Sequence, residues 1–179
     1  RNLKKIAKSK GVNQISEFFT HRNSFKIKKK YGEFDIITAN HVCAHVENLK
    51  DFFLGVKNLL NYNGLFIFEV SYRGSVLKKN TFDTIYHEHI DYHALKPLKK
   101  FAESFGLYVY DFKLHKAQGG SIRVFLTKNE KVINQYRKNK INNFIKKEID
   151  SSKLFTEKTY FKFKQKIQFA KKKLNKLLI

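Results

Sequence analysis

The sequence predicts an α/β fold in which parallel strands are closed by an antiparallel pair and followed by C-terminal helices. Two continuous apolar runs, 34–40 and 65–70, are typical of strands buried on both faces of a sheet. A helical pattern over 49–61 lies between them, and this strand–helix–strand order implies a right-handed crossover and parallel pairing. Two further strand-like runs, 107–114 and 121–126, flank a glycine pair typical of a hairpin turn.

The segment before the first apolar strand is expected to hold a helix and then a strand. Residues 1–10 place apolar side chains at helical spacing among lysines, and Gly11 ends that pattern. Residues 12–19 predict a strand that ends in Phe18 and Phe19. An aromatic residue at a strand end is more often part of a core than a ligand contact.

The ends of the two apolar strands are the expected ligand-binding positions. Ligands of open α/β sheets bind outside the carboxyl ends of the parallel strands. Asn40 and His41 follow the first strand, and His45 stands just beyond them. Tyr72 follows the second strand, where a residue that lines a pocket and a residue that caps the core are equally compatible with the sequence.

The remaining elements are helical. Apolar residues of 49–61 share one helical face, and the polar stretch 61–64 is expected to close that helix. Pro97 suits the first turn of a helix that ends before Gly106. Two more helices are predicted over 130–148 and about 151–178. The second carries an apolar stripe, which predicts a packing face, with a surface-bound amphipathic helix as the alternative.

Residues 82–93 are the densest stretch of proton-transferring groups, with three His, three acidic residues and two Tyr. Proton transfer needs a group that titrates near neutrality and a neighbour that fixes its orientation. In an extended chain Tyr86 and Glu88 point to the same side, and a local bend would bring His89 to them. We refer to residues 82–93 as the window.

Two other interpretations of the window stay open. A polar surface turn with no catalytic role would have the same composition. A metal site would use His89 and His93, which are four residues apart, but the order His87-Glu88-His89 is not the zinc-protease pattern. No metal is predicted.

Three motifs in order, at 82–89, 95–98 and 119–124, resemble the class I S-adenosylmethionine-dependent sugar C-methyltransferases, which act on nucleotide-linked keto-sugars. The resemblance implies a partial Rossmann-like methyltransferase domain over 1–129 and a helical arm over 130–179 that leads to a further C-terminal domain. It also implies that the chain is a fragment, inactive alone, which lacks the family's zinc module and its glycine-rich cofactor motif.

The resemblance further implies a set of site residues. The family's Tyr-His-Glu-His block lines the sugar pocket, and Ala44-His45-Val46 matches a run that holds one more catalytic His. Carried over, the catalytic group is Tyr86, Glu88, His89 and His45; the S-adenosylmethionine contacts are Asn40, His41, Phe18 and Phe19; and the substrate contacts are Tyr72, His87, Gly119 and Gly120.

The implied reaction removes a proton from the sugar carbon next to the ketone and then methylates that carbon. His89, assisted by Glu88, is the expected base, although the sequence leaves open which of the two takes the proton. Tyr86 and His45 are expected to stabilise the enolate oxygen.

The net charge of +22 raises a rival interpretation, a basic nucleic-acid-binding module. About half of this charge lies in 130–179, and only five of the 37 basic residues are Arg. Such a distribution is typical of lysines filling solvated positions, so nucleic-acid binding ranks second.

A cytoplasmic protein without a membrane span is expected. The chain has no 18-residue apolar run. Its single cysteine, Cys43, excludes an internal disulfide and suits a reducing compartment, where it is expected to be a small buried residue.

Overall fold

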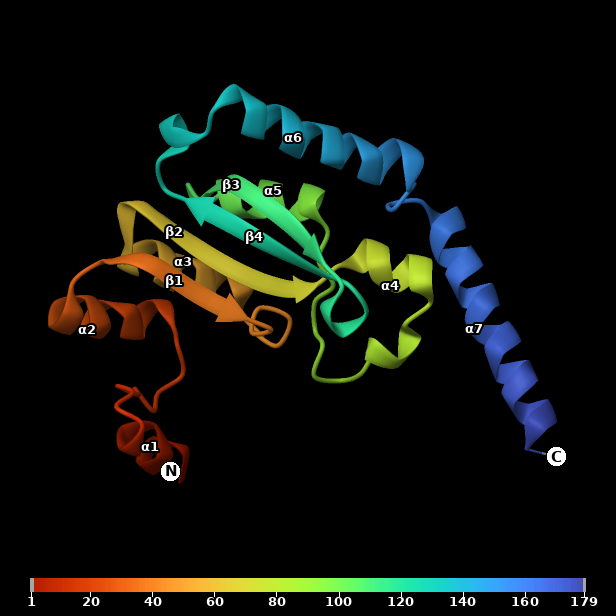
Figure 1. Cartoon of the computed structure of the whole chain (residues 1–179), viewed down its shortest axis with the longest axis horizontal. Helices are drawn as coiled ribbons and strands as arrows, with labels where there is room; N and C mark the ends of the chain where they lie inside the picture. Colours follow the sequence, from red (N-terminus) through yellow and green to blue (C-terminus); the bar gives the residue numbers. More distant parts are fainter. Residues whose placement is uncertain (1, 179) are drawn as a thin grey trace.

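The computed structural model describes residues 2–178 and contains one four-stranded sheet with helices on its flanks (Figure 1). The elements, in chain order, are α1 Asn2–Ser9, α2 His21–Tyr31, β1 Phe34–Asn40, α3 Leu49–Leu59, β2 Leu60–Ser71, α4 Arg73–Lys79, α5 Leu95–Glu103, β3 Tyr108–His115, β4 Ser121–Thr127, α6 Gln135–Lys146 and α7 Glu157–Leu177.

The sheet has the order β1-β2-β4-β3. β1 and β2 run parallel, with Asn40 opposite Glu69, whereas β4 pairs antiparallel with both β2 and β3. The predicted α/β fold, with parallel strands closed by an antiparallel pair, is therefore confirmed. The register also brings the carboxyl ends of β1 and β2 to the same edge.

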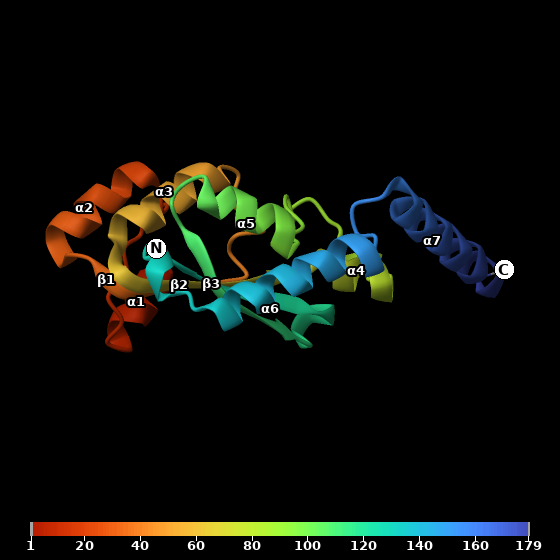
Figure 2. The same ribbon diagram turned by 90° about the horizontal axis from the view of Figure 1, so that it is seen from above.

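One face of the sheet is covered by α3 and α5, which lie with α2 on the same side of it (Figure 2). Phe53 of α3 is the centre of this core, because its ring meets those of Phe66, Phe68 and Phe101 at centroid distances of 5.7, 5.9 and 5.2 Å. Such aromatic contacts add to the free energy gained from burial alone. The core fixes β2, the strand that leads into the window.

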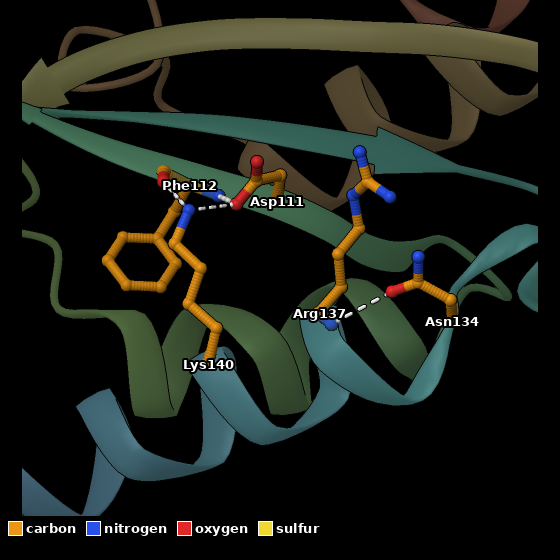
Figure 3. Close-up of polar contacts among 5 residues, drawn as sticks. All are labelled: Asp111, Phe112, Asn134, Arg137 and Lys140. Atoms are coloured by element: carbon orange, nitrogen blue, oxygen red, sulfur yellow. Dashed lines mark hydrogen bonds and ion pairs between the residues drawn. The ribbon is translucent and has the colours of Figure 1, made fainter.

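α6 packs along β3 through a mixed polar and aromatic contact (Figure 3). Lys140 donates to the carboxylate of Asp111 and to the carbonyl of Phe112, whose ring lies 4.5 Å from that of Phe144. Asn134 caps the helix by accepting from the N–H of Arg137 at 3.0 Å.

The predicted strand over 12–19 was wrong. An extended segment becomes a strand only when a neighbouring strand accepts its hydrogen bonds, and none of the described residues pairs with this one. The sequence interpretation also missed α2, whose lysine-rich face hides its periodicity. Thr20 caps α2 by accepting from Asn23 N–H at 3.1 Å, and Gly32 ends it.

Two other boundaries differ from the predictions. α3 ends at Leu59, and β2 takes in the stretch 61–64 that was expected to close the helix. A Cβ at Gly64 would lie 2.9 Å from the carbonyl oxygen of Asp35, so this glycine permits close strand approach and is no helix stop. In the arm, α6 starts at Gln135 rather than at 130.

α7 projects away from the sheet (Figure 1). Within the described residues none of its side chains is buried, and Leu177 is 82% exposed, so the expected packing face of this helix stays a prediction. None of the helices among residues 2–178 is both long and apolar enough to cross a membrane.

Candidate active site

The site begins where β1 ends. Asn40 is exposed at the carboxyl edge of the sheet, and His41 directly after it has a left-handed backbone with φ of 53°. This conformation is uncommon for a residue with a side chain. It is held by a hydrogen bond of 2.8 Å from His41 N–H to the carbonyl of Glu69, so β1 turns sharply at the rim.

The loop after β1 is tied to the window. Ala44 accepts from the N–H of Ile90 at 2.9 Å, and Nδ1 of His45 donates to the carbonyl of Glu88 at 2.8 Å. These bonds join two loops that follow neighbouring parallel strands. As a result, the ring of His45 lies 4.8 Å from the ring of His89.

A turn in the window places Tyr86 beside His89. The N–H of His89 donates to the carbonyl of Tyr86 at 3.0 Å, and the Tyr86 hydroxyl lies 3.2 Å from Nε2 of His89. Nδ1 of His89 lies 2.7 Å from the carbonyl of Thr84, which can only accept, so Nδ1 carries the hydrogen. Neutral His89 then has a bare Nε2, to which the Tyr86 hydroxyl donates.

Glu88 and His87 occupy the tip of this turn and face solvent. Their side chains are 63% and 89% exposed, and the contact that joins them, Glu88 Oε1 to His87 Nε2, is 3.9 Å long. The structure therefore brings Tyr86, His89 and His45 together and leaves the Glu88 carboxylate outside that group. The turn breaks the extended backbone on which the expected pairing of Tyr86 with Glu88 rested.

Tyr72 is buried rather than open to a pocket. Its hydroxyl donates to Oε1 of Glu148 at 3.0 Å. Burial raises the pKa of this phenol, and the negative charge of Glu148 adds to the effect. Of the two compatible interpretations, this buried contact favours a residue that caps the core.

The two glycines of the hairpin lie against α4. Gly119 accepts from Lys79 Nζ at 2.8 Å, and Gly120 accepts from the N–H of Tyr72 at 2.9 Å. A Cβ at Gly120 would lie 2.4 Å from the Ser75 hydroxyl, so no side chain fits there. The backbone φ of Gly120 is 129°, a conformation that glycine adopts readily and that other residues rarely adopt. The two glycines therefore let the hairpin pack closely against α4 rather than against a ligand.

Phe18 and Phe19 belong to the segment directly before α2, which Figure 1 shows at the β1 end of the sheet, apart from the loop that follows α4. Phe19 packs edge-on against Phe52 at 5.2 Å, whereas Phe18 is 93% exposed. Both line a hollow of about 450 Å³ between residues 13–19 and α2. Phe18 thus offers an open aromatic face, and Phe19 belongs partly to the core.

Two positions that build the site, Thr84 and Tyr92, were not among the expected site residues. The carbonyl of Thr84 accepts from both His89 and the Tyr92 hydroxyl, the latter at 3.0 Å. Burial raises the pKa of Tyr92. A backbone acceptor leaves no signal in a sequence, although Tyr92 itself was visible as a phenol inside the window. Among residues 2–178, no three His, Cys, Asp or Glu side chains are grouped to hold a metal ion.

Comparison with known proteins gives matches over nearly the whole chain. A family model described as a methyltransferase domain matches residues 3–111, and one described as a C-methyltransferase C-terminal domain matches residues 116–179. C-methyltransferase NovU from Streptomyces niveus is 38% identical over 125 residues, which are 70% of this chain and 30% of that protein. The chain thus spans about a third of the length of this curated relative.

Two solved structures are also similar. Magnesium protoporphyrin IX methyltransferase (ChlM) from Synechocystis PCC 6803, solved with bound SAH, is 12% identical, with a TM-score of 0.43 over 54% of this chain and 46% of that one. M1.HpyAVI is 19% identical, with a TM-score of 0.35 over 60% of this chain and 52% of that one.

Proposed function

The chain belongs to the C-methyltransferase family, and we propose that it serves to move a methyl group from S-adenosylmethionine to a carbon next to the ketone of a nucleotide-linked sugar. The two family matches follow each other along the chain and support this reaction class. The observation that carries the chemistry is the hydrogen bond of 3.2 Å between Tyr86 and His89, with Nδ1 of His89 held by a carbonyl.

The reaction needs a base, because a carbon next to a ketone becomes nucleophilic only after it loses a proton. We assign this step to Nε2 of His89. The carbonyl of Thr84 holds the hydrogen on Nδ1, so Nε2 is the accepting nitrogen of the neutral ring. His89 is a better candidate than Glu88, whose carboxylate faces solvent beside His87.

The reaction also needs a donor to the oxygen on which negative charge develops. The Tyr86 hydroxyl donates to His89 in the structure described above. When a ketone oxygen lies beside this phenol, Tyr86 turns its hydrogen to that oxygen and Nε2 of His89 becomes available. A fixed donor of this kind lowers a barrier by roughly 3 kcal/mol.

His45 has a separate role in this proposal. Because its Nδ1 donates to the carbonyl of Glu88, the Nε2 of the neutral ring is an acceptor suited to a sugar hydroxyl. If His45 is protonated, Nε2 donates instead and helps to stabilise the enolate oxygen. Either way the ring, 4.8 Å from that of His89, belongs to the substrate side of the site.

The cofactor, when bound, supplies an electrophilic methyl group. The residues that fit it lie at the carboxyl edge of the sheet, where Asn40 presents an exposed amide beside His41. The aromatic face of Phe18 suits stacking on an adenine ring. The turn at His41 leads the chain from the end of β1 directly into the loop that carries His45.

The test is to incubate the protein, in the longest form that its gene encodes, with isotopically labelled S-adenosylmethionine and a panel of nucleotide-linked keto-sugars. We expect the label on a carbon adjacent to the ketone, located by NMR of the product. The matched sugar with a hydroxyl in place of the ketone should accept no methyl group, because it cannot form an enolate. Label on oxygen or nitrogen would contradict the proposal.

A further inference from the structure

Glu148 is a buried carboxylate that no part of the proposed chemistry uses. The residue is 1% exposed, and its side chain accepts three hydrogen bonds. Oε1 accepts from the Tyr72 hydroxyl at 3.0 Å and from the N–H of Leu95 at 2.9 Å, and Oε2 accepts from the N–H of Lys96 at 2.9 Å. Burying a carboxylate is unfavourable unless its oxygens are partnered in this way.

The three donors lie at the two ends of the connection between β2 and α5, residues 73–94, which contains α4 and the window and is named the 73–94 loop. Tyr72 directly precedes residues 73–94, and Leu95 directly follows them. The same oxygen of Glu148 therefore holds both ends. A backbone bond of 2.8 Å from Arg73 N–H to the carbonyl of His93 closes the base of the loop beside it.

Glu148 reaches this place through the irregular end of α6. The helix passes into a π-turn, Lys147–Ser151, and the N–H of Leu154 donates to the carbonyl of Glu148 at 2.9 Å. π-turns are uncommon and often serve functional sites. The carboxylate also replaces a local cap, because Ala94, the residue before α5, offers no side chain to the first N–H groups of the helix.

We infer that Glu148 is a positioning residue, which clasps the two ends of the 73–94 loop and so fixes Tyr86 and His89 for proton transfer. The inference rests on the proposed function, because the clasp acts on the reaction through those two side chains. It also gives the helical arm a role at the site, since the carboxylate comes from the C-terminal part of the chain. A displacement of about 1 Å in a reacting group can lower a rate roughly 100-fold.

The test compares Glu148→Ala, Glu148→Gln and Tyr72→Phe, with the exposed Glu157→Gln as control. Turnover is expressed per folded molecule, well below the unfolding temperature. We expect Glu148→Ala to lower kcat about 10- to 100-fold while KM changes little, because the reacting groups shift but binding contacts remain. Glu148→Gln should fall between Ala and wild type, and the control should match wild type.

Amide hydrogen exchange gives a second readout that needs no substrate. A glutamine keeps one oxygen, which should stay with Tyr72 and Leu95, while its NH₂ group meets the N–H of Lys96. Glu148→Gln should therefore speed exchange at Lys96 and leave Leu95 protected. If Glu148→Ala fails to fold, Glu148→Gln and Tyr72→Phe carry the test.

The outcomes separate the two proposals. Normal kcat per folded molecule in the Glu148 and Tyr72 variants, with turnover lost in Tyr86→Phe, would overturn the clasp and leave the proposed function standing. Normal turnover in Tyr86→Phe would overturn the proposed function and this inference with it. A drop in activity that only follows the unfolded fraction would show Glu148 to be purely structural, and would also overturn the inference.

Discussion

The imidazole rings of His45 and His89 lie 4.8 Å apart although they follow different parallel strands of the sheet. Each ring has its Nδ1 hydrogen held by a backbone carbonyl, that of Glu88 for His45 and that of Thr84 for His89. The two rings therefore share the same tautomer in their neutral forms. Such preorganisation before a ligand arrives is what a proton-transfer site requires.

Tyr86→Phe should lower kcat roughly 100- to 1000-fold, because the phenol is the proposed donor to the enolate oxygen. KM should change little. Steady-state kinetics of methyl transfer measures both, with Tyr136→Phe as control, since Tyr136 is 76% exposed on α6. A Tyr86→Phe variant with turnover near that of the control would remove Tyr86 from the mechanism.

The neighbours His87, Glu88 and His89 should respond very differently to substitution. His89→Gln should lose at least 100-fold in kcat, as expected for loss of a general base. The kcat values of His87→Gln and Glu88→Gln should each stay within about threefold of wild type. Both side chains are exposed to solvent, which screens their charge from the reacting group. Equal losses in Glu88→Gln and His89→Gln would show that the loop rearranges to bring the carboxylate into the site.

His93 should make the protein less stable as the pH falls. Burial lowers the pKa of His93 below 6.5, an effect partly offset by the charge of Asp91. Between that lowered pKa and 6.5 the unfolded chain binds the proton and the folded chain does not. The free energy of unfolding therefore falls as the pH drops through 6.5 toward that lowered pKa, by at most about 1.4 kcal/mol per pH unit from this group.

Urea unfolding at several pH values measures this slope. His93→Gln should flatten it, whereas the exposed His87→Gln should leave it unchanged. If the free energy of unfolding of His93→Gln changes with pH as it does in the wild type, the acid sensitivity comes from other groups.

The thiol of Cys43 should be inert in the folded protein. Cys43 is fully buried, and burial raises its pKa to about 12. Because the thiolate is the reactive form, a thiol reagent at pH 8 should give no signal from folded protein and one equivalent after denaturation. Rapid labelling of the folded protein would mean that the loop between His41 and His45 opens.

Much of the fold could be predicted because the buried strands and amphipathic helices carry strong periodic patterns. The strands 34–40, 107–114 and 121–126 were found within about one residue of their observed bounds. α2 and α4 were missed, since the sequence of α2 is rich in lysine and α4 is only seven residues long. The strand expected over 12–19 failed because sequence pattern does not reveal whether a pairing partner is present.

The site was predictable in its residue types but not in its contacts. The density of titratable groups pointed to the window, and the structure brings Tyr86 and His89 together there. What orients them is the carbonyl of Thr84, and what holds the loop is Glu148, more than 50 positions further along from Leu95. Backbone acceptors and distant carboxylates are set by tertiary structure, so no local pattern reports them.

The most direct test of the central claim is solvent deuterium exchange at the carbon next to the ketone. The protein is incubated in D₂O with a nucleotide-linked keto-sugar and S-adenosylhomocysteine, which has no methyl group to transfer, and exchange is followed by NMR. We expect the wild type to exchange this hydrogen. The exchange rate of His89→Gln should be at least 100-fold lower, as expected for loss of a general base. Exchange at the wild-type rate in His89→Gln would contradict the account.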